Sequence, residues 1–427
     1  MLRALHRSTL IVFALMLGAC SGEQANDGPQ EPTLTIGQWH AEIELPGGNA
    51  DFGLELSKDD QDWKATIING SERIAVPEVS FDSSRLSLRF PAFNNRIDAI
   101  LVDGTLKGSL TLVKRYGKTQ VIPFRAAPGA RTPGSTDAQA MADLSGRWAV
   151  TFTEDDGSEY PAIGEFQQRG NKLLGTFLTE TGDYRYLGGS MRGDTMRLST
   201  FDGAHAFLFE ATLAENGDLN GRFWSGNQSL ESWTARRNAD VTLADPASLT
   251  FLKEGYETFE FTFPDLEGNS VSLSDPAFDG KVILVTLAGS WCPNCHDEAA
   301  LMSELYPQYK DKGVEVIALM YEHLEDESAA IQQVRHFRDK FDIQYTTLLA
   351  GISDKTRAAE TLPALSRVLA FPTTIFIDRE GNVRAIHTGF SGPGTGEHYI
   401  KQRQSITDML DELVAESDDV NANEEDA

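Results

Sequence analysis

The chain has 427 residues, of which 41% are hydrophobic, so it is long enough to form two to four domains. Its 37 basic and 64 acidic residues give a formal net charge of −27, which argues against binding to nucleic acid or to anionic lipid headgroups. We attribute this acidity to solubility rather than to recognition of a partner.

The first 19 residues have the pattern of a secretory signal peptide. Arg3 and Arg7 precede an apolar run over residues 10–17, which is too short to span a bilayer, and small residues follow it. Residues 17–20 (Leu-Gly-Ala-Cys) resemble a bacterial lipobox, in which the cysteine is lipidated and becomes the first residue of the mature chain. The resemblance implies a lipid anchor on Cys20. The alternative is an ordinary cleaved signal that ends beside a cysteine.

The next segment, residues 20–34, is poor in apolar side chains and is predicted to be a tether. With the lipobox, it places the protein in the cell envelope, anchored by lipid and facing the periplasm. Ser21 after the cysteine favours the outer membrane over the inner one, by analogy with other lipoproteins.

Two segments, residues 35–127 and 143–238, show the pattern of antiparallel β-structure. Apolar and polar residues alternate in short runs such as 85–90, and turn residues interrupt the runs. Residues 192–194 (Arg-Gly-Asp) could be an adhesion signal, but we interpret them as a hairpin turn, because glycine and aspartate suit turn backbones.

The two β segments form a predicted internal repeat. Gly37-Gln-Trp39 corresponds to Gly146-Arg-Trp148, and residues 123–126 correspond to residues 232–235, all at an offset of 109 residues. A common offset at both ends indicates a duplication. We therefore expect two small barrels or sandwiches, separated by a linker over 128–142.

After a second linker over 239–257, strands and helices alternate, which predicts an α/β domain over 258–415. Residues 281–287 form a continuous apolar run, typical of a strand that is buried on both faces. The acidic tail, residues 416–427, is predicted to be disordered.

The sequence Cys292-Pro293-Asn294-Cys295 follows this strand and begins a predicted helix. Free amides and the helix dipole at such an N-terminus stabilise a thiolate, so we expect an exposed, reactive Cys292. Cys295 is spaced to resolve the mixed disulfide that Cys292 forms.

Residues 288–295 (Ala-Gly-Ser-Trp-Cys-Pro-Asn-Cys), followed by residues 371–378 (Phe-Pro-Thr-Thr-Ile-Phe-Ile-Asp), resemble the TlpA-like thioredoxins. The resemblance covers about 258–415 and implies a thioredoxin-like fold. It also implies that Pro372 is a cis proline that faces the cysteine pair, and that Glu298 is a carboxyl group near the active site. An alternative for Glu298 is an ordinary carboxylate on the helix surface.

Together with the cysteines, Glu298 and Pro372 are the candidate catalytic residues. The candidate substrate-binding residues flank the cysteines or the proline, and they are Trp291, Pro293, Asn294, Phe371 and Thr373. A cis proline exposes the preceding backbone for pairing with an extended substrate, which is the reason for including Phe371.

The sequence therefore predicts a thiol-disulfide oxidoreductase, more specifically a disulfide reductase, that acts on exported proteins and has no metal or cofactor. A reductase in an oxidising compartment needs a supply of electrons, so a membrane thiol-reductant carrier is an implied partner. The β segments would act as a spacer or as a docking site for clients.

Several alternatives remain. Cys292 to His296 also matches the haem c attachment motif, although a preceding buried strand does not suit a small helical cytochrome. A structural zinc site lacks a second cysteine pair. A peroxiredoxin-like antioxidant would have threonine where Gly289 stands. Finally, the β repeats could be a binding protein with the thioredoxin-like domain as an accessory.

Overall fold

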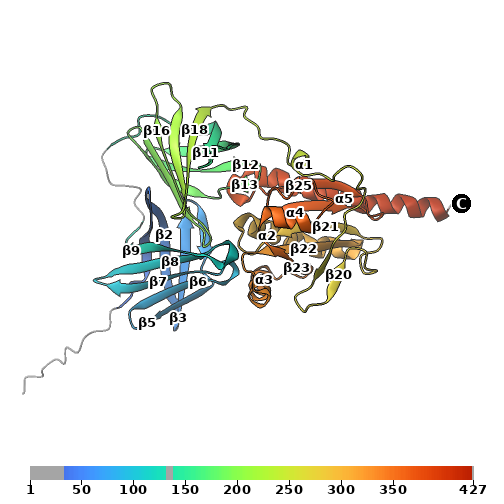
Figure 1. The fold of residues 1–427 in the computed structure, drawn as a ribbon. Helices are drawn as coiled ribbons and strands as arrows, with labels where there is room; N and C mark the ends of the chain where they lie inside the picture. Colours follow the sequence, from blue (N-terminus) through green and yellow to red (C-terminus); the bar gives the residue numbers. More distant parts are fainter. Residues whose placement is uncertain (1–32, 131–137, 426–427) are drawn as a thin grey trace, which may run out of the picture.

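The computed structural model describes residues 33–130 and 138–425, which form three bodies (Figure 1). A nine-stranded sheet and a β-barrel lie together on one side, and an α/β domain lies against both of them. The predicted signal peptide, Cys20, most of the predicted tether and the middle of the first linker lie outside the described residues. Within the described part of the chain, no helix is long and apolar enough to cross a bilayer.

The first body is a curled antiparallel sheet with the strand order β4-β3-β2-β1-β9-β8-β7-β6-β5. Two short 3-10 helices, η1 (Pro91–Phe93) and η2 (Arg115–Gly117), interrupt it. Apolar side chains alternate with polar ones along each strand, which buries one face of the sheet. The strands are β1 (Gly37–Leu45), β2 (Gly48–Asp59), β3 (Asp62–Asn69), β4 (Glu72–Ala75), β5 (Glu78–Asp82), β6 (Arg85–Phe90), β7 (Asn95–Val102), β8 (Thr105–Val113) and β9 (Thr119–Pro128).

The second body is a closed barrel of eight antiparallel strands. The pairing of β11 with β12 closes it, and the two-residue strand β13 is added at β12. Residues 192–194 form a hairpin turn between β14 and β15, as predicted. The strands are β10 (Gly146–Thr153), β11 (Glu159–Arg169), β12 (Lys172–Thr179), β13 (Gly182–Asp183), β14 (Leu187–Arg192), β15 (Thr195–Phe201), β16 (Ala206–Leu213), β17 (Leu219–Ser225) and β18 (Ser229–Arg237).

The two β bodies repeat the same local structure at the offset of 109 residues. The pairing register of β1 with β9 recurs at this offset between β10 and β18. The indole N–H of Trp39 donates to Thr35 O and that of Trp148 to Leu144 O, both at 2.9 Å. Matching registers and matching tryptophan contacts support the predicted duplication, although one copy closes into a barrel and the other remains a curled sheet.

The third body is a five-stranded sheet with the order β23-β22-β21-β24-β25, flanked by helices. Strands β21, β22 and β23 are parallel to one another, β24 is antiparallel to its neighbour β21, and β25 is antiparallel to β24. Every side chain of β21 is buried, as the apolar run predicted. The main elements are β21 (Val282–Ala288), α2 (Pro293–Tyr309), β22 (Val314–Glu322), α3 (Glu327–Phe341), β23 (Thr346–Ile352), α4 (Lys355–Thr361), β24 (Thr373–Ile377), β25 (Val383–Thr388) and α5 (Glu397–Glu425).

Several smaller elements were not predicted from the sequence. Strand β23 and helix α4 follow α3, and a hairpin precedes β21. The second linker includes a short helix packed beside β25, where Thr388 Oγ1 donates to Thr250 Oγ1 at 2.9 Å. The remaining elements are α1 (Pro246–Leu249), β19 (Thr262–Pro264), β20 (Ser270–Ser272), η3 (Lys310–Lys312) and η4 (Pro393–Thr395).

The acidic tail differs from its prediction, because α5 continues to Glu425. Disorder was expected from residue 416 onwards on account of charge. Alanine and glutamate are good helix formers, and a helix that is already nucleated by packing extends at little cost.

The two-tryptophan repeat gives a stability prediction. Trp39 is 1% exposed, so Trp39→Ala should lower the free energy of unfolding by about 3–5 kcal/mol. Trp63, in the same sheet, is only partly buried and packs edge-on against Phe81, so Trp63→Ala is a matched control with a smaller loss. Urea unfolding followed by circular dichroism measures both. Equal losses would contradict this account of the core.

Candidate active site

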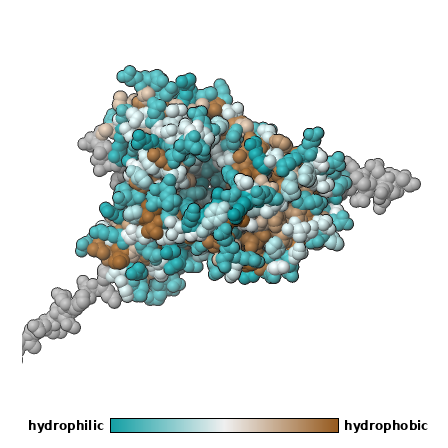
Figure 2. Space-filling view, in the orientation of Figure 1, coloured by the Kyte–Doolittle hydropathy of each residue, from teal (hydrophilic) through white to brown (hydrophobic). Residues whose placement is uncertain are grey.

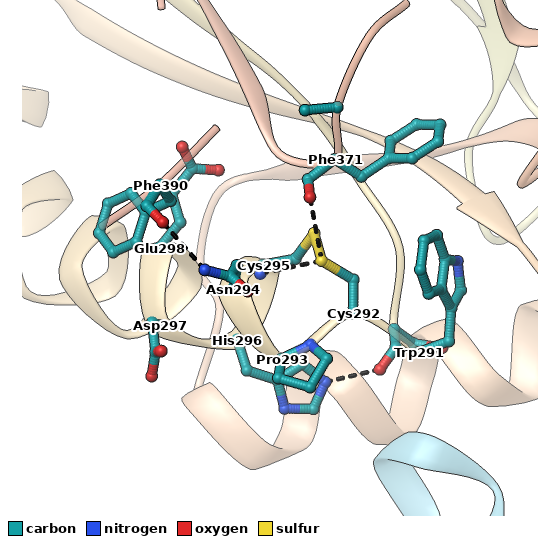
Figure 3. The surroundings of a disulfide bond; sticks show 12 residues. Trp291, Cys292, Pro293, Asn294, Cys295, His296, Asp297, Glu298, Phe371 and Phe390 are labelled. Carbon is teal, nitrogen blue, oxygen red and sulfur yellow. Dashed lines mark hydrogen bonds between the residues drawn. A yellow bond between two sulfur atoms is a disulfide. The ribbon is translucent and has the colours of Figure 1, made fainter. Parts of the chain in front are cut away.

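The two cysteines lie at the N-terminus of α2, immediately after β21 (Figure 3). Their sulfur atoms form a disulfide bond. Cys292 is the N-cap residue, and its Sγ accepts a hydrogen bond from the backbone N–H of Cys295 at 3.2 Å. Pro293 occupies the first turn, where a missing N–H leaves no bond unmade. The helix dipole and this N–H both favour a negative charge on Cys292.

The loop before β24 faces the disulfide. The Phe371–Pro372 peptide bond is cis, as the family resemblance implied, and Phe371 O lies 3.3 Å from Cys292 Sγ (Figure 3). Thr373 does not present its side chain to a substrate, because it is buried and its hydroxyl donates to Ala370 O at 2.9 Å. Its predicted binding role therefore becomes a role in shaping this loop.

Trp291 is held rigidly beside the cysteines. Its indole N–H donates to Tyr321 O at 2.8 Å, and its ring stacks on His323 at 4.5 Å. Phe371 contacts the indole edge-on, with 5.8 Å between the ring centroids. Trp291 and Phe371 thus form one apolar wall of the site.

Glu298 is buried in the core behind the cysteines, and the alternative of a surface carboxylate is wrong. It is 2% exposed. Thr374 Oγ1 donates to Glu298 Oε1 at 2.5 Å, and Thr286 Oγ1 donates to its other oxygen. Burial raises the pKa of Glu298 to about 7, although the two threonine hydroxyls oppose this shift.

A second buried carboxyl group, Glu322, was missed from the sequence. It accepts hydrogen bonds from Ser290 N at 2.9 Å and from Ser290 Oγ at 2.6 Å. Burial raises the pKa of Glu322 to about 7. A signal was present, because Glu322 ends a buried strand parallel to β21, and the carboxyl ends of parallel strands meet at one edge of the sheet.

His296, next to Cys295, is buried and fully engaged. Its Nε2 lies 2.6 Å from Ser290 O, and Lys340 Nζ lies 2.9 Å from its Nδ1. Burial and the charge of Lys340 lower the pKa of His296 well below its usual value. Phe93, from η1 of the nine-stranded sheet, stacks on its ring at 4.1 Å. With both ring nitrogens bonded and the cysteines bonded to each other, the haem c interpretation does not fit this geometry.

The prediction of an exposed Cys292 is wrong. Cys292 is 5% exposed and Cys295 1%, because both belong to the core of the α/β domain and Phe371 lies against Cys292, while the β bodies cover the neighbouring residues at the N-terminus of α2. Asn294 Nδ2 donates to Asp183 Oδ2 of the barrel at 3.1 Å, and Arg185 Nη1 donates to Pro293 O at 3.5 Å. The sequence motif could not show this, because the covering residues come from a distant part of the chain.

Other potential metal ligands lie away from the cysteines. His40, Glu42 and Asp51 gather on strands β1 and β2, with 3.1 Å between His40 Nε2 and Asp51 Oδ1. All three are partly exposed, and a cross-strand ion pair explains the group.

Comparison with known proteins agrees with this geometry. The Redoxin family model matches residues 253–400. The thiol-disulfide oxidoreductase ResA of Bacillus thuringiensis subsp. konkukian is 32% identical over 148 residues, which are 35% of this chain and 77% of the relative. The thioredoxin-like protein YneN of Bacillus subtilis is 30% identical over 138 residues, which are 32% of this chain and 73% of that one.

The chain belongs to the ResA-like thiol-disulfide oxidoreductases. A solved structure, the thioredoxin domain of a thiol-disulfide oxidoreductase from Bacteroides vulgatus, is 25% identical and covers 36% of this chain and 98% of its own, with a TM-score of 0.27. The Redoxin match begins at residue 253, so the two β bodies precede the family's domain. The Redoxin match therefore gives no information on the contacts between the β bodies and the oxidoreductase domain.

The buried Glu298 gives a prediction for pH dependence. The pKa of Glu298 is about 7 in the folded chain, against an ordinary value of 4.5 for glutamate. As the pH rises through this range, the unfolded chain releases its proton first, so wild type loses unfolding free energy of up to about 3 kcal/mol. Glu298→Gln can still bond both threonines and should show a smaller loss than wild type, because of the two buried acids, Glu298 and Glu322, only Glu322 then contributes. Urea unfolding at pH about 5 and about 8 measures the difference.

Glu304→Gln is the control, since Glu304 lies on the same helix but is exposed and pairs with Arg403. The Arg403 hydrogen bond lowers the pKa of Glu304, so Glu304 is ionised in both the folded and the unfolded chain at about pH 5 and at about pH 8. This variant should therefore keep the wild-type difference in unfolding free energy between the two pH values. If Glu298→Gln kept the pH slope of wild type, Glu298 would not be the buried acid described above.

Proposed function

We propose that this oxidoreductase reduces disulfide bonds in exported proteins through the Cys292/Cys295 pair. The single observation that carries the proposal is the position of Cys292, at a helix N-terminus and 3.3 Å from the backbone oxygen of Phe371 before a cis proline. A substrate strand that pairs with this loop would bring its own sulfur next to Cys292.

The proposed reaction is two thiol–disulfide exchanges. The Cys292 thiolate attacks one sulfur of the client disulfide, forms a mixed disulfide and releases the first client thiolate. The Cys295 thiolate then attacks Cys292 Sγ, forms the intramolecular disulfide and releases the second client thiolate. Two electrons pass from the cysteine pair to the client, and each released thiolate takes up a proton.

Glu298 is suited to the proton transfers that accompany the second exchange. It lies one helical turn after Cys295 on α2, and its pKa of about 7 allows it to hold or release a proton near neutral pH. Asn294 and Pro293 would contribute to substrate binding only after the barrel residues that contact them move away.

The place of action and the electron donor are also proposals. The lipobox resemblance at Cys20 and the signal-like N-terminus support a lipid anchor in the cell envelope, facing the periplasm, with the outer membrane favoured. Because disulfides persist in that compartment, the pair needs a membrane thiol-reductant carrier to restore its dithiol.

Reduction of insulin disulfides by dithiothreitol tests the reaction. Wild type should accelerate it, and Cys292→Ser should fall to the uncatalysed rate, because the attacking sulfur is lost. Reduced Cys295→Ser, mixed with insulin after dithiothreitol has been removed, should keep the first exchange and accumulate a mixed disulfide with insulin, seen on a non-reducing gel. Full activity in the Cys292→Ser, Cys295→Ser double variant would overturn the proposal and favour a binding function for the β bodies.

The reduction potential of the pair tests the direction of electron flow. Thioredoxin-fold pairs span about −120 to −270 mV, and a reductase should lie below about −220 mV. Equilibration of the mature chain in thiol buffers, followed by alkylation and mass measurement, gives the potential. A value near −120 mV would mark an oxidant instead.

A further inference from the structure

A short segment of the barrel lies directly against the active-site motif. We name residues 180–186, which include β13 and connect β12 with β14, the strap. Asp183 Oδ2 in the strap accepts hydrogen bonds from Asn294 Nδ2 at 3.1 Å and from Gly392 N at 2.7 Å. The strap therefore contacts Asn294, one of the two residues between the cysteines, and also the loop after β25.

Arg185 fixes the strap in this position. Its Nη2 donates to Glu72 Oε1 of the nine-stranded sheet at 2.7 Å, and its Nη1 donates to Asp297 on α2. Asp202 of the barrel lies 3.9 Å from its Nε. Its φ of 56° is in the left-handed region, which an arginine rarely occupies unless its surroundings hold it there. One buried cation thus links all three bodies beside the cysteines.

The strap also explains why the loop at residues 388–396 is rich in glycine. A Cβ atom on Gly394 would lie 2.9 Å from the carbonyl carbon of Arg185, and one on Gly389 would lie 2.9 Å from that of Thr181. Glycine is needed at these places because the strap backbone passes too close for any side chain. The oxidoreductase domain is shaped to receive the strap.

On its other side the strap borders a cleft of about 670 Å³ between the three bodies. Figure 2 shows this hollow, with mainly hydrophilic side chains around it. Tyr186 and Gly394 are among the lining residues, whereas neither cysteine is. The strap thus lies between the cleft and the Cys292/Cys295 pair, and the cleft is large enough for a peptide segment.

We propose that the strap determines which disulfides the cysteine pair accepts. With the strap in place, small thiols and disulfides reach Cys292, and protein disulfides do not. Protein disulfides enter from the cleft when the strap leaves Asn294 and the loop at 388–396. This inference rests on the proposed disulfide exchange and adds its substrate selection.

Gly394→Ala tests the strap without changing a charge or touching the cysteine motif. The added methyl group should push the strap backbone away, because the atoms nearest to it all belong to Arg185. The measured quantity is the ratio of the insulin rate to the rate with a small aromatic disulfide, each started from the reduced protein. A larger open population should raise this ratio by about tenfold over wild type.

Arg185→Gln is the second variant, since it keeps a polar side chain but removes the cation that links the bodies. It should raise the same ratio. Arg236→Gln is the matched control, because Arg236 also pairs with a barrel carboxylate, Asp218, but at an exposed place. Its ratio should equal that of wild type. Thermal unfolding of each variant confirms that it is folded.

A second readout does not depend on catalysis. Alkylation of the reduced protein is compared between iodoacetamide and a maleimide attached to a protein carrier, and both variants should favour the bulky reagent relative to wild type. Folded variants with wild-type ratios in both assays would overturn the inference. If no chain reduced either disulfide but the alkylation ratio rose, the proposed function would fail and the strap would still be shown to control access.

Discussion

The buried charge of Arg185 is the interaction on which the arrangement of the three bodies depends. Carboxylates from the sheet, the barrel and α2 converge on it, and the side chain is only 15% exposed. Charges in such a place are tolerated only when they are paired, because each has lost its hydration. Moving the α/β domain away from the two β bodies, which share a hydrophobic core, would expose these groups to water, and water can replace the lost pairs. The junction is therefore specific in its closed form without being irreversible.

This junction decides the surroundings in which the cysteines react. The N-terminus of α2 favours a thiolate on Cys292, whereas burial disfavours every charge there. Glu298 and Glu322, both with a pKa of about 7, lie on either side of the segment that carries the cysteines. Burial is the cause of both pKa shifts, so these carboxyl groups, like the cysteines, lie in surroundings that disfavour charge.

The local parts of this site could be predicted from sequence, and the parts made by distant contacts could not. Periodicity and motif spacing are local properties of the sequence. They therefore predicted the element in which each motif lies: the apolar run of β21, the Cys-Pro-Asn-Cys sequence and the Phe371–Pro372 dipeptide. The barrel closes because β11 pairs with β12. The first β body has the same alternation of apolar and polar residues but lacks a closing pair, so this alternation could not predict closure. The cover over Pro293 and Asn294 depends on single side chains such as Arg185 and Asp183, which no periodicity marks. The glycines at 388–396 were visible, but the strap that requires them was not.

The duplication gives both β copies a part in the junction. At the offset of 109 residues, the strap corresponds to residues 71–77 of the first copy, which include β4 and Glu72, the partner of Arg185. A second pair of equivalent loops, the one after β6 and the one after β15, also lies at the junction. Phe93, which stacks on His296, corresponds to Asp202, which lies beside Arg185.

Equivalent loops of the two copies thus meet at one place. The first copy supplies the carboxylate of Glu72 and the ring of Phe93, and the second copy supplies the cation of Arg185 and the carboxylate of Asp202. A duplicated β unit can form such a surface only if its copies diverge at the contacting loops and keep their cores. The conserved tryptophan contacts and the differing loops show this division. The β bodies are therefore built as a two-part cover for the oxidoreductase domain, which a simple spacer would not require.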